Sequence, residues 1–196
     1  IMVYAKTVQE AARLTQAMGQ GQMQKTYLAV LTGCPAEKAG TLEDLLFHDR
    51  VKNKTYVVKR MRGGVKQAKL HYEILARQDG LSLVRIRLET GRTHQIRVHM
   101  EYINHWVVGD QTYGNPGRSS NLGLCRQFLH SYFIEFQHPC INDTLSFMAP
   151  LPDDLIQAIS QLADRRIGLT ERGHEVLAAY QENCGITEER ESFALV

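Results

Sequence analysis

One short stretch of the sequence concentrates side chains that can bind anions or move protons. It is E-T-G-R-T-H-Q-I-R-V-H over residues 89–99, and within eight positions it holds Arg92, His94, Gln95, Arg97 and His99. Arginine donates five N–H groups in a fixed plane and pairs with carboxylates or phosphates, while histidine takes up or releases a proton near neutral pH. This stretch is therefore the first candidate for a functional site.

Arg97 is the residue whose surroundings most constrain its chemistry. The pattern T-H-Q-I-R-V-H-M-E-Y-I-N predicts a helix with Thr93 as N-cap and with Ile96, Met100 and Ile103 on one face. Arg97 then lies one turn inside the helix beside apolar positions, where a partly buried guanidinium needs an anionic partner. That partner is a structural carboxylate, a catalytic carboxylate or a phosphate, and spacing alone favours the structural ion pair.

Other kinds of site find little support in the sequence. His94 and His99 are five positions apart and belong to no H-E-x-x-H pattern, so we expect no metal site. There is no G-x-S-x-G, phosphate-binding P-loop or G-x-G-x-x-G pattern, and we expect no cofactor. The cysteines are far apart and predict reduced thiols: Cys34, Cys125, Cys140 and Cys184.

Length and composition are those of an ordinary globular chain. The 196 residues suffice for one domain with a substantial core or two small ones, and 43% of them are hydrophobic and 22% charged. No apolar run approaches the ~20 residues that span a bilayer. We expect a monomeric cytoplasmic protein without membrane contact.

Charge is unevenly placed along the chain. Residues 48–69 carry eight lysines and arginines against one acid, Asp49, whereas residues 153–196 carry nine acids against four arginines. The basic middle is consistent with a polyanionic partner such as RNA, and equally with a solvated hairpin.

Hydrophobic periodicity predicts interspersed helices and strands. Helices are expected over 8–18, 93–104, 151–163 and 169–185. Strands are expected over 25–33, 40–47, 54–61, 68–77, 81–89, 127–138 and 144–150. Without a regular strand–helix–strand rhythm, this pattern favours an α+β fold with a mixed, mostly antiparallel sheet and flanking helices.

Several segments resemble the RluA-type RNA pseudouridine synthases. They are K-T-Y-L-A-V-L-T-G at 25–33, the motif from E-T-G-R-T-H-Q-I-R-V-H to G-D-Q-T-Y-G at 89–114, and F-L-H-S-Y-F-I-E-F-Q-H-P with L-S-F-M-A-P-L-P-D-D-L at 128–155. The middle motif is highly specific. The resemblance implies a pseudouridine synthase-like catalytic portion over residues 1–160, followed by a helical extension of unknown role over 161–196.

The resemblance also implies an activity. Family members isomerise uridine in RNA, such as rRNA or tRNA, to pseudouridine without a cofactor. An aspartate carboxylate adds to the flipped nucleotide, the glycosidic bond breaks, the uracil turns, and C5 bonds to the ribose. By resemblance, Arg97 pairs with that aspartate, which would hold the carboxylate ionised and aimed. Tyr27 stacks on the target base and takes part in proton handling.

Other residues acquire substrate-binding roles through the same resemblance. Ile96 would line the pocket, and the start of the helix would contact the RNA backbone or base through Arg92, His94 and Gln95. The basic stretch would follow the phosphates through Lys52, Lys59, Arg60 and Arg62.

The chain departs from the family pattern in one respect. The family's aspartate belongs to an H-R-L-D-x-x-T-S-G segment just before a strand like I-M-V-Y-A-K-T, and no H-R-L-D occurs in this sequence. We expect the nucleophile to lie upstream of Ile1 and the chain alone to be inactive. Asp110, in G-D-Q-T-Y-G, is expected to be a structural turn residue. The alternative is a non-catalytic RNA-binding module or a ribosome-associated factor.

Overall fold

The fold is built from one large sheet and three helices. In the computed structural model the helices are α1 (Val8–Gly19), α2 (Gln95–Tyr102) and α3 (Asp153–Ala163). The strands are β1 (Met23–Thr32), β2 (Ala39–Asp49), β3 (Lys54–Val58), β4 (Val65–Gln78), β5 (Leu81–Leu88), β6 (Leu129–Gln137), β7 (Thr144–Met148) and β8 (Gly168–Leu169). The structure describes residues 1–78, 80–115, 117, 121–138, 141, 143–163, 168–169, 173, 175 and 178.

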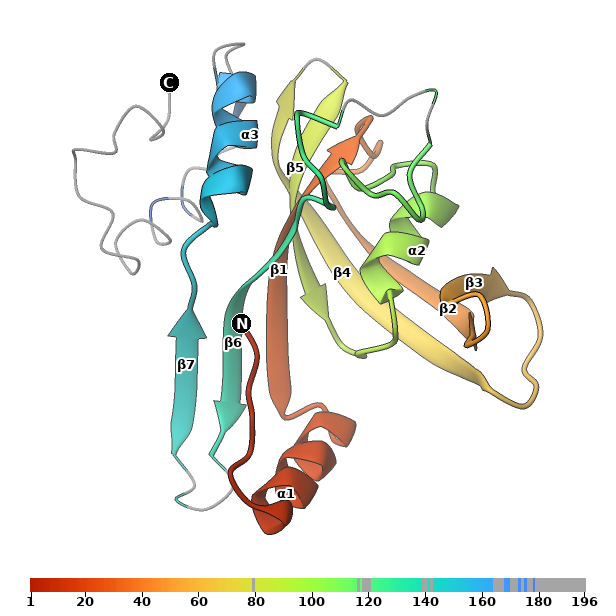
Figure 1. Cartoon of the computed structure of the whole chain (residues 1–196), viewed down its shortest axis with the longest axis vertical. Coiled ribbons are helices and arrows are strands. Elements are labelled where there is room, and N and C mark those ends of the chain that lie inside the picture. The colour runs from red at the N-terminus through yellow and green to blue at the C-terminus, as the bar shows by residue number, and fades with distance from the viewer. Residues whose placement is uncertain are drawn as a thin grey trace.

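The strands form a single antiparallel sheet (Figure 1). Their order is β3-β2-β4-β5-β1-β6-β7, and β8 pairs with β4 outside this path. Every strand pairing in the described part of the chain is antiparallel. The predicted α+β class with a mostly antiparallel sheet is confirmed.

Helices cover both faces of the sheet at one of its interior strands, β1. Leu28 of β1 packs in one apolar cluster with Leu155 of α3. Ala29 and Leu31, which point the opposite way along the strand, pack in another cluster with Ile96 of α2. A strand buried on both sides needs a continuous apolar run, and this explains the sequence Y-L-A-V-L.

The entry into α2 differs from the sequence prediction. The N-cap is His94, in the left-handed conformation at φ 55° and without a side-chain cap bond, so the prediction of Thr93 as N-cap is wrong. The Gln95 side chain shapes this turn because its oxygen accepts the Arg92 N–H at 3.0 Å and its amide donates to the Lys69 carbonyl at 3.0 Å. These bonds anchor the first residue of α2 to β4 and replace the expected hydroxyl cap.

The carboxy-terminal part is described only in places. Gly168 and Leu169 of β8 pair with Arg77 and Ala76 of β4. Most of the helix predicted over 169–185 lies outside the described residues, and the division at residue 160 stays a prediction. In the described ranges, no helix is both long and apolar enough to cross a membrane.

Candidate functional site

Arg97 of α2 is held by a two-pronged ion pair with Asp110. Arg97 Nε donates to Asp110 Oδ2 at 2.6 Å and Nη2 donates to Oδ1 at 2.7 Å. The Arg97 side chain is 12% exposed and that of Asp110 is 0% exposed. Asp110 Oδ1 also accepts the backbone N–H groups of Thr112 and Tyr113, each at 2.9 Å. The carboxylate is therefore fixed by its own turn and by the helix.

The turn that carries Asp110 depends on the glycine before it. Gly109 has φ 74°, and a side chain at this position would collide with the Arg126 carbonyl oxygen. Glycine therefore permits both the left-handed backbone and the close approach of the neighbouring chain. This explains in physical terms why G-D stands at the start of the turn.

The ion pair is reflected in the pKa of both partners. Burial alone would raise the pKa of the Asp110 carboxyl, but hydrogen bonds from Arg97, Tyr113 and Thr112, with the charge of Arg97, outweigh it and lower this pKa. The hydrogen bond to Asp110 raises the pKa of Arg97 against the opposing effect of burial. Both shifts favour the charged pair, which agrees with the structural ion pair that spacing favours.

Tyr113 connects this ion pair to the β2–β3 hairpin. Its hydroxyl accepts the Thr55 N–H at 2.7 Å and lies 3.0 Å from His94 Nδ1. Its ring lies 4.8 Å from the Arg97 guanidinium carbon and 4.9 Å from the Lys54 ammonium. Because Tyr113 is only 2% exposed, these contacts join β3, α2 and the turn in one buried unit.

Thr55 completes this connection and had no signal in the sequence. Its hydroxyl donates to the Thr93 carbonyl at 2.9 Å and lies 3.1 Å from His48 Nδ1. Since 38 residues separate Thr55 from Thr93, no local pattern indicates that they meet.

His94 lies inside this network as a partly buried imidazole. Its ring packs edge-to-face with those of Tyr113 and His48, at centroid distances of 5.6 and 6.2 Å. Burial lowers the pKa of His94, and the nearby charges of Arg97 and His48 lower it further. The ring therefore holds its proton less readily than a free histidine, and its Nδ1 is engaged with protein rather than with substrate.

Tyr27 lies on the sheet face that α2 covers. It is half-buried and packs against the cluster that contains Ala29, Leu31 and Ile96. The Tyr27 side chain and helix α2, which carries Arg97, thus lie on the same side of the sheet. Among the described residues no hydrogen bond or ring contact joins Tyr27 and Arg97.

Ile96 and Gln95 are placed in the interior. Ile96 is 4% exposed and belongs to the core cluster, and Gln95 is buried with its amide bonded to Thr90, Arg92 and Lys69. The visible role of both is to hold α2 on the sheet.

Arg92 is more exposed to solvent than Gln95 and Ile96. Its Nε donates to the Gln67 carbonyl at 2.8 Å, which anchors the side chain along β4. Other N–H groups of its guanidinium form no hydrogen bond to the described chain, so Arg92 has donors to offer a ligand.

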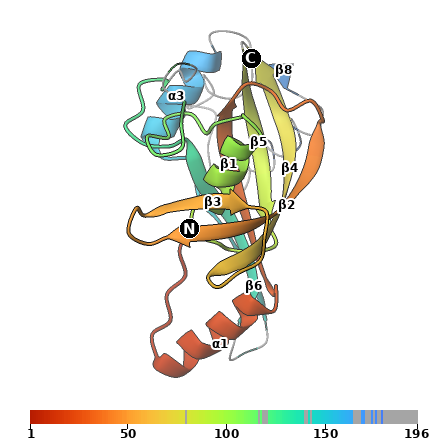
Figure 2. The same cartoon turned by 90° about the vertical axis from the view of Figure 1, so that its right-hand side faces the viewer.

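The four predicted phosphate contacts are all exposed. Lys52 lies between β2 and β3, whereas Lys59, Arg60 and Arg62 lie between β3 and β4. Figure 2 shows β3 alongside α2, and the contact between these two elements brings the basic loops to the side of the sheet where Arg97 lies.

His99 is buried and cannot act at the surface. Neither ring nitrogen has a hydrogen-bond partner in the described ranges, and the nearest carboxylate oxygen, on Asp44, is 3.8 Å from Nε2. Burial lowers the pKa of His99 to about 4, which keeps the ring neutral near pH 7. In the part of the chain that the structure describes, no three His, Cys, Asp or Glu side chains form a possible metal site.

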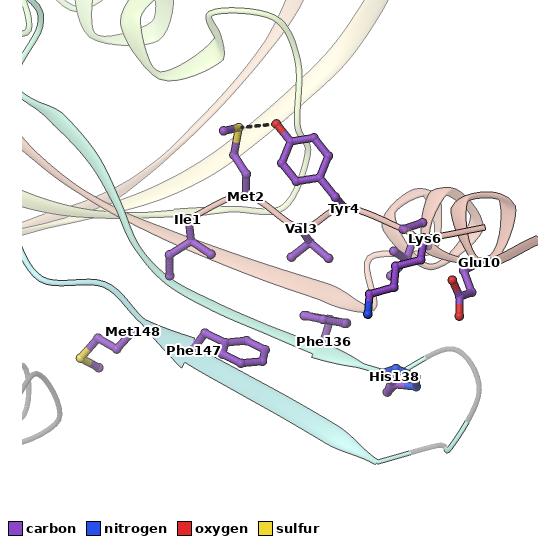
Figure 3. A pocket seen from close by; sticks show the side chains of 12 residues that line it. Ile1, Met2, Val3, Tyr4, Lys6, Glu10, Phe136, His138, Phe147 and Met148 are labelled. Carbon is purple, nitrogen blue, oxygen red and sulfur yellow. Dashed lines mark hydrogen bonds between the residues drawn. The ribbon is translucent and has the colours of Figure 1, made fainter. Parts of the chain in front are cut away.

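An apolar cleft of about 670 Å³ lies elsewhere, between the first residues of the chain and the β6–β7 edge (Figure 3). Ile1, Tyr4, Phe136 and Phe147 are among the side chains that line it. None of the predicted site residues lines this cleft, and the sequence did not indicate it.

Two solved structures share this fold. Human RNA pseudouridylate synthase domain containing 1 superposes with a TM-score of 0.67 at 22% identity, covering 92% of this chain and 74% of its own. Human RNA pseudouridylate synthase domain containing 4 superposes with a TM-score of 0.66 at 21% identity. The match covers 84% of this chain and 70% of that protein. At this identity the likeness concerns the fold, which is that of a pseudouridine synthase domain.

Sequence comparison identifies the family. A family model described as RNA pseudouridylate synthase matches residues 1–102. Ribosomal large subunit pseudouridine synthase D of Haemophilus influenzae is 34% identical over 172 residues, 83% of this chain and 52% of the relative. An uncharacterized RNA pseudouridine synthase of Chloroflexus aurantiacus is 38% identical over 166 residues, 84% of this chain and 50% of the relative. The chain belongs to the RluA-type RNA pseudouridine synthases and spans about half the length of these curated relatives.

The first prediction concerns the ion pair. Replacing Asp110 by Asn should lower the free energy of unfolding at pH 7 by about 3 kcal/mol, because it leaves Arg97 buried without a counter-charge. The folded-state pKa of Asp110 is lowered, so its stabilisation is complete above the unfolded pKa of about 3.9 and is lost as pH falls through the folded value. Urea unfolding should therefore show a difference between wild type and variant that shrinks below about pH 4.

The control is Glu43→Gln, which neutralises an exposed carboxylate on β2. It should change the free energy of unfolding by less than about 0.5 kcal/mol. If Asp110→Asn were equally harmless, the ion pair would not hold α2 and the turn together.

Proposed function

We propose that this chain forms most of the catalytic unit of an RNA pseudouridine synthase that acts on structured RNA, either ribosomal or transfer RNA. The nucleophilic aspartate lies upstream of Ile1, in the segment that H-R-L-D represents in the family. The protein acts as a monomer in the cytoplasm, and its chemistry uses its own side chains without a cofactor.

This proposal rests on one observation: only some of the N–H groups of the Arg97 guanidinium are hydrogen-bonded within the described chain. Asp110 takes Nε–H and one N–H of Nη2, and the other three of the five N–H groups form no hydrogen bond to the described chain. Asp110 thus fixes the plane of the guanidinium from one edge. The remaining donors can orient a second carboxylate, the nucleophile, in the way that a preorganised site requires.

Tyr27 supplies the complementary surface. Its half-buried ring lies on the same side of the sheet as α2, where an unstacked uracil can rest on it. In the reaction the bond from N1 to C1′ breaks and a bond from C5 to C1′ forms. C5 then gives up its hydrogen as a proton and N1 takes one up, so atoms and electrons balance without an oxidant or reductant.

RNA binding through the basic loops gives the second prediction. Reversing Lys52, Lys59, Arg60 and Arg62 together to Glu should weaken binding to RNA of many sequences alike, because phosphate contacts carry no sequence information. The dependence of log K on log salt should become shallower by about 0.7 for each phosphate that the variant no longer neutralises. Fluorescence anisotropy with labelled RNA over a salt series measures both quantities.

The matched control reverses two exposed lysines outside the basic loops, Lys6 and Lys38. It should leave affinity within about threefold of wild type. Unchanged affinity in the four-residue variant would mean that the basic loops are ordinary solvated surface.

The third prediction separates catalysis from stability at Arg97. In the protein that includes the upstream segment, Arg97→Lys should reduce turnover at least about a hundredfold with a near-native melting temperature. Lysine retains a charge for Asp110 but lacks the planar fork that aims a second carboxylate. Pseudouridine in digested RNA is counted by chromatography. A large loss of melting temperature with turnover retained would leave Arg97 as a structural residue only.

A further inference from the structure

Lys25, two positions before Tyr27 on β1, is a half-buried cation that has no role in the site described above. Residues two apart on a strand point to the same face, so its side chain shares the face of Tyr27 and α2. Its neighbours across the sheet are apolar, namely Leu88 of β5 and Ile134 of β6. A charged side chain in such a row loses hydration without gaining a polar neighbour.

No acid in the described chain neutralises Lys25. No carboxylate lies within ion-pair distance of its ammonium there, although five other lysines and arginines in that part of the chain pair with an acid. The acid that follows Leu88, Glu89, is already engaged by Lys69 and His71. Burial lowers the pKa of the Lys25 ammonium, and no opposite charge counteracts this effect.

The ammonium reaches the loop that leads into α2. A Cβ built on Gly91 would lie 4.0 Å from Lys25 Nζ. Gly91 directly precedes Arg92, which has unengaged N–H groups. Lys25 therefore brings a positive charge from β1, the strand of Tyr27, to Gly91, the residue before Arg92.

We propose that Lys25 binds a phosphodiester group of the RNA next to the nucleotide that stacks on Tyr27. This inference rests on the proposed function, because it names a contact of the same site. An incoming phosphate supplies the counter-charge that the described chain lacks, and a half-buried ammonium binds it more strongly than one in open solvent. The unpaired lysine costs stability in the free protein, as functional groups in binding sites often do.

The test compares Lys25→Met with Lys25→Arg in this chain, using fluorescently labelled oligouridylate as the probe. Met has a similar length and fits the apolar row, so Lys25→Met should melt at the same temperature as wild type or higher. Its affinity at low salt should fall about tenfold, with a salt slope shallower by about 0.7. Lys25→Arg keeps the charge and should retain affinity within about threefold, and Lys38→Met, at an exposed lysine, should behave as wild type.

Two results would overturn the proposal while leaving the proposed function intact. In the first, Lys25→Met binds oligouridylate as tightly as wild type. In the second, Lys25→Met loses melting temperature together with affinity, which would mark Lys25 as a structural residue. If wild type itself did not bind oligouridylate in a salt-dependent manner, RNA binding by this chain would fail and the proposal with it. The wild-type titration therefore distinguishes the two failures.

Discussion

The two-pronged ion pair between Arg97 and Asp110 is the interaction on which the arrangement of the site depends. A buried guanidinium has few acceptable partners, and a carboxylate that also accepts two backbone N–H groups has little freedom to move. The pair therefore fixes α2 relative to the 109–114 turn. If either partner were removed, the charge of the other would be buried alone, and the free energy of unfolding would fall by several kcal/mol.

This constraint extends through Tyr113 to the basic loops on either side of β3, which carry Lys52, Lys59, Arg60 and Arg62. Its hydroxyl bonds to the backbone of β3, and its ring lies beside Arg97 and Lys54. Strand β3, which lies between the two loops that carry the exposed lysines and arginines, is consequently tied to the helix that carries Arg97. A single buried network thus couples the place where phosphates would bind, under the proposed function, to the place where a carboxylate would be oriented.

The elements were predictable from sequence, while their contacts were only partly so. A run of apolar residues that ends at Gly33 indicated β1, alternation indicated β4 and β5, and helical spacing indicated α2, because burial imposes these patterns locally. The same reasoning placed Arg97 beside apolar positions and identified its need for an anion. It did not identify Asp110 as the partner, because spacing does not tell which turn folds over a helix. The prediction of Thr93 as N-cap was wrong since a distant hydrogen bond, from Gln95 to Lys69, shapes that turn.

Release of tritium from RNA that contains 5-tritiated uridine tests the central claim most directly, because C5 loses its hydrogen when the new bond to C1′ forms. The chain without an H-R-L-D segment should give background counts even when it is folded and binds RNA. Adding the upstream segment, in cis or as a second chain, should restore release. Release by this chain alone would contradict the account and make Asp110 the first residue to mutate, whereas no release after addition of the segment would favour a non-catalytic RNA-binding module.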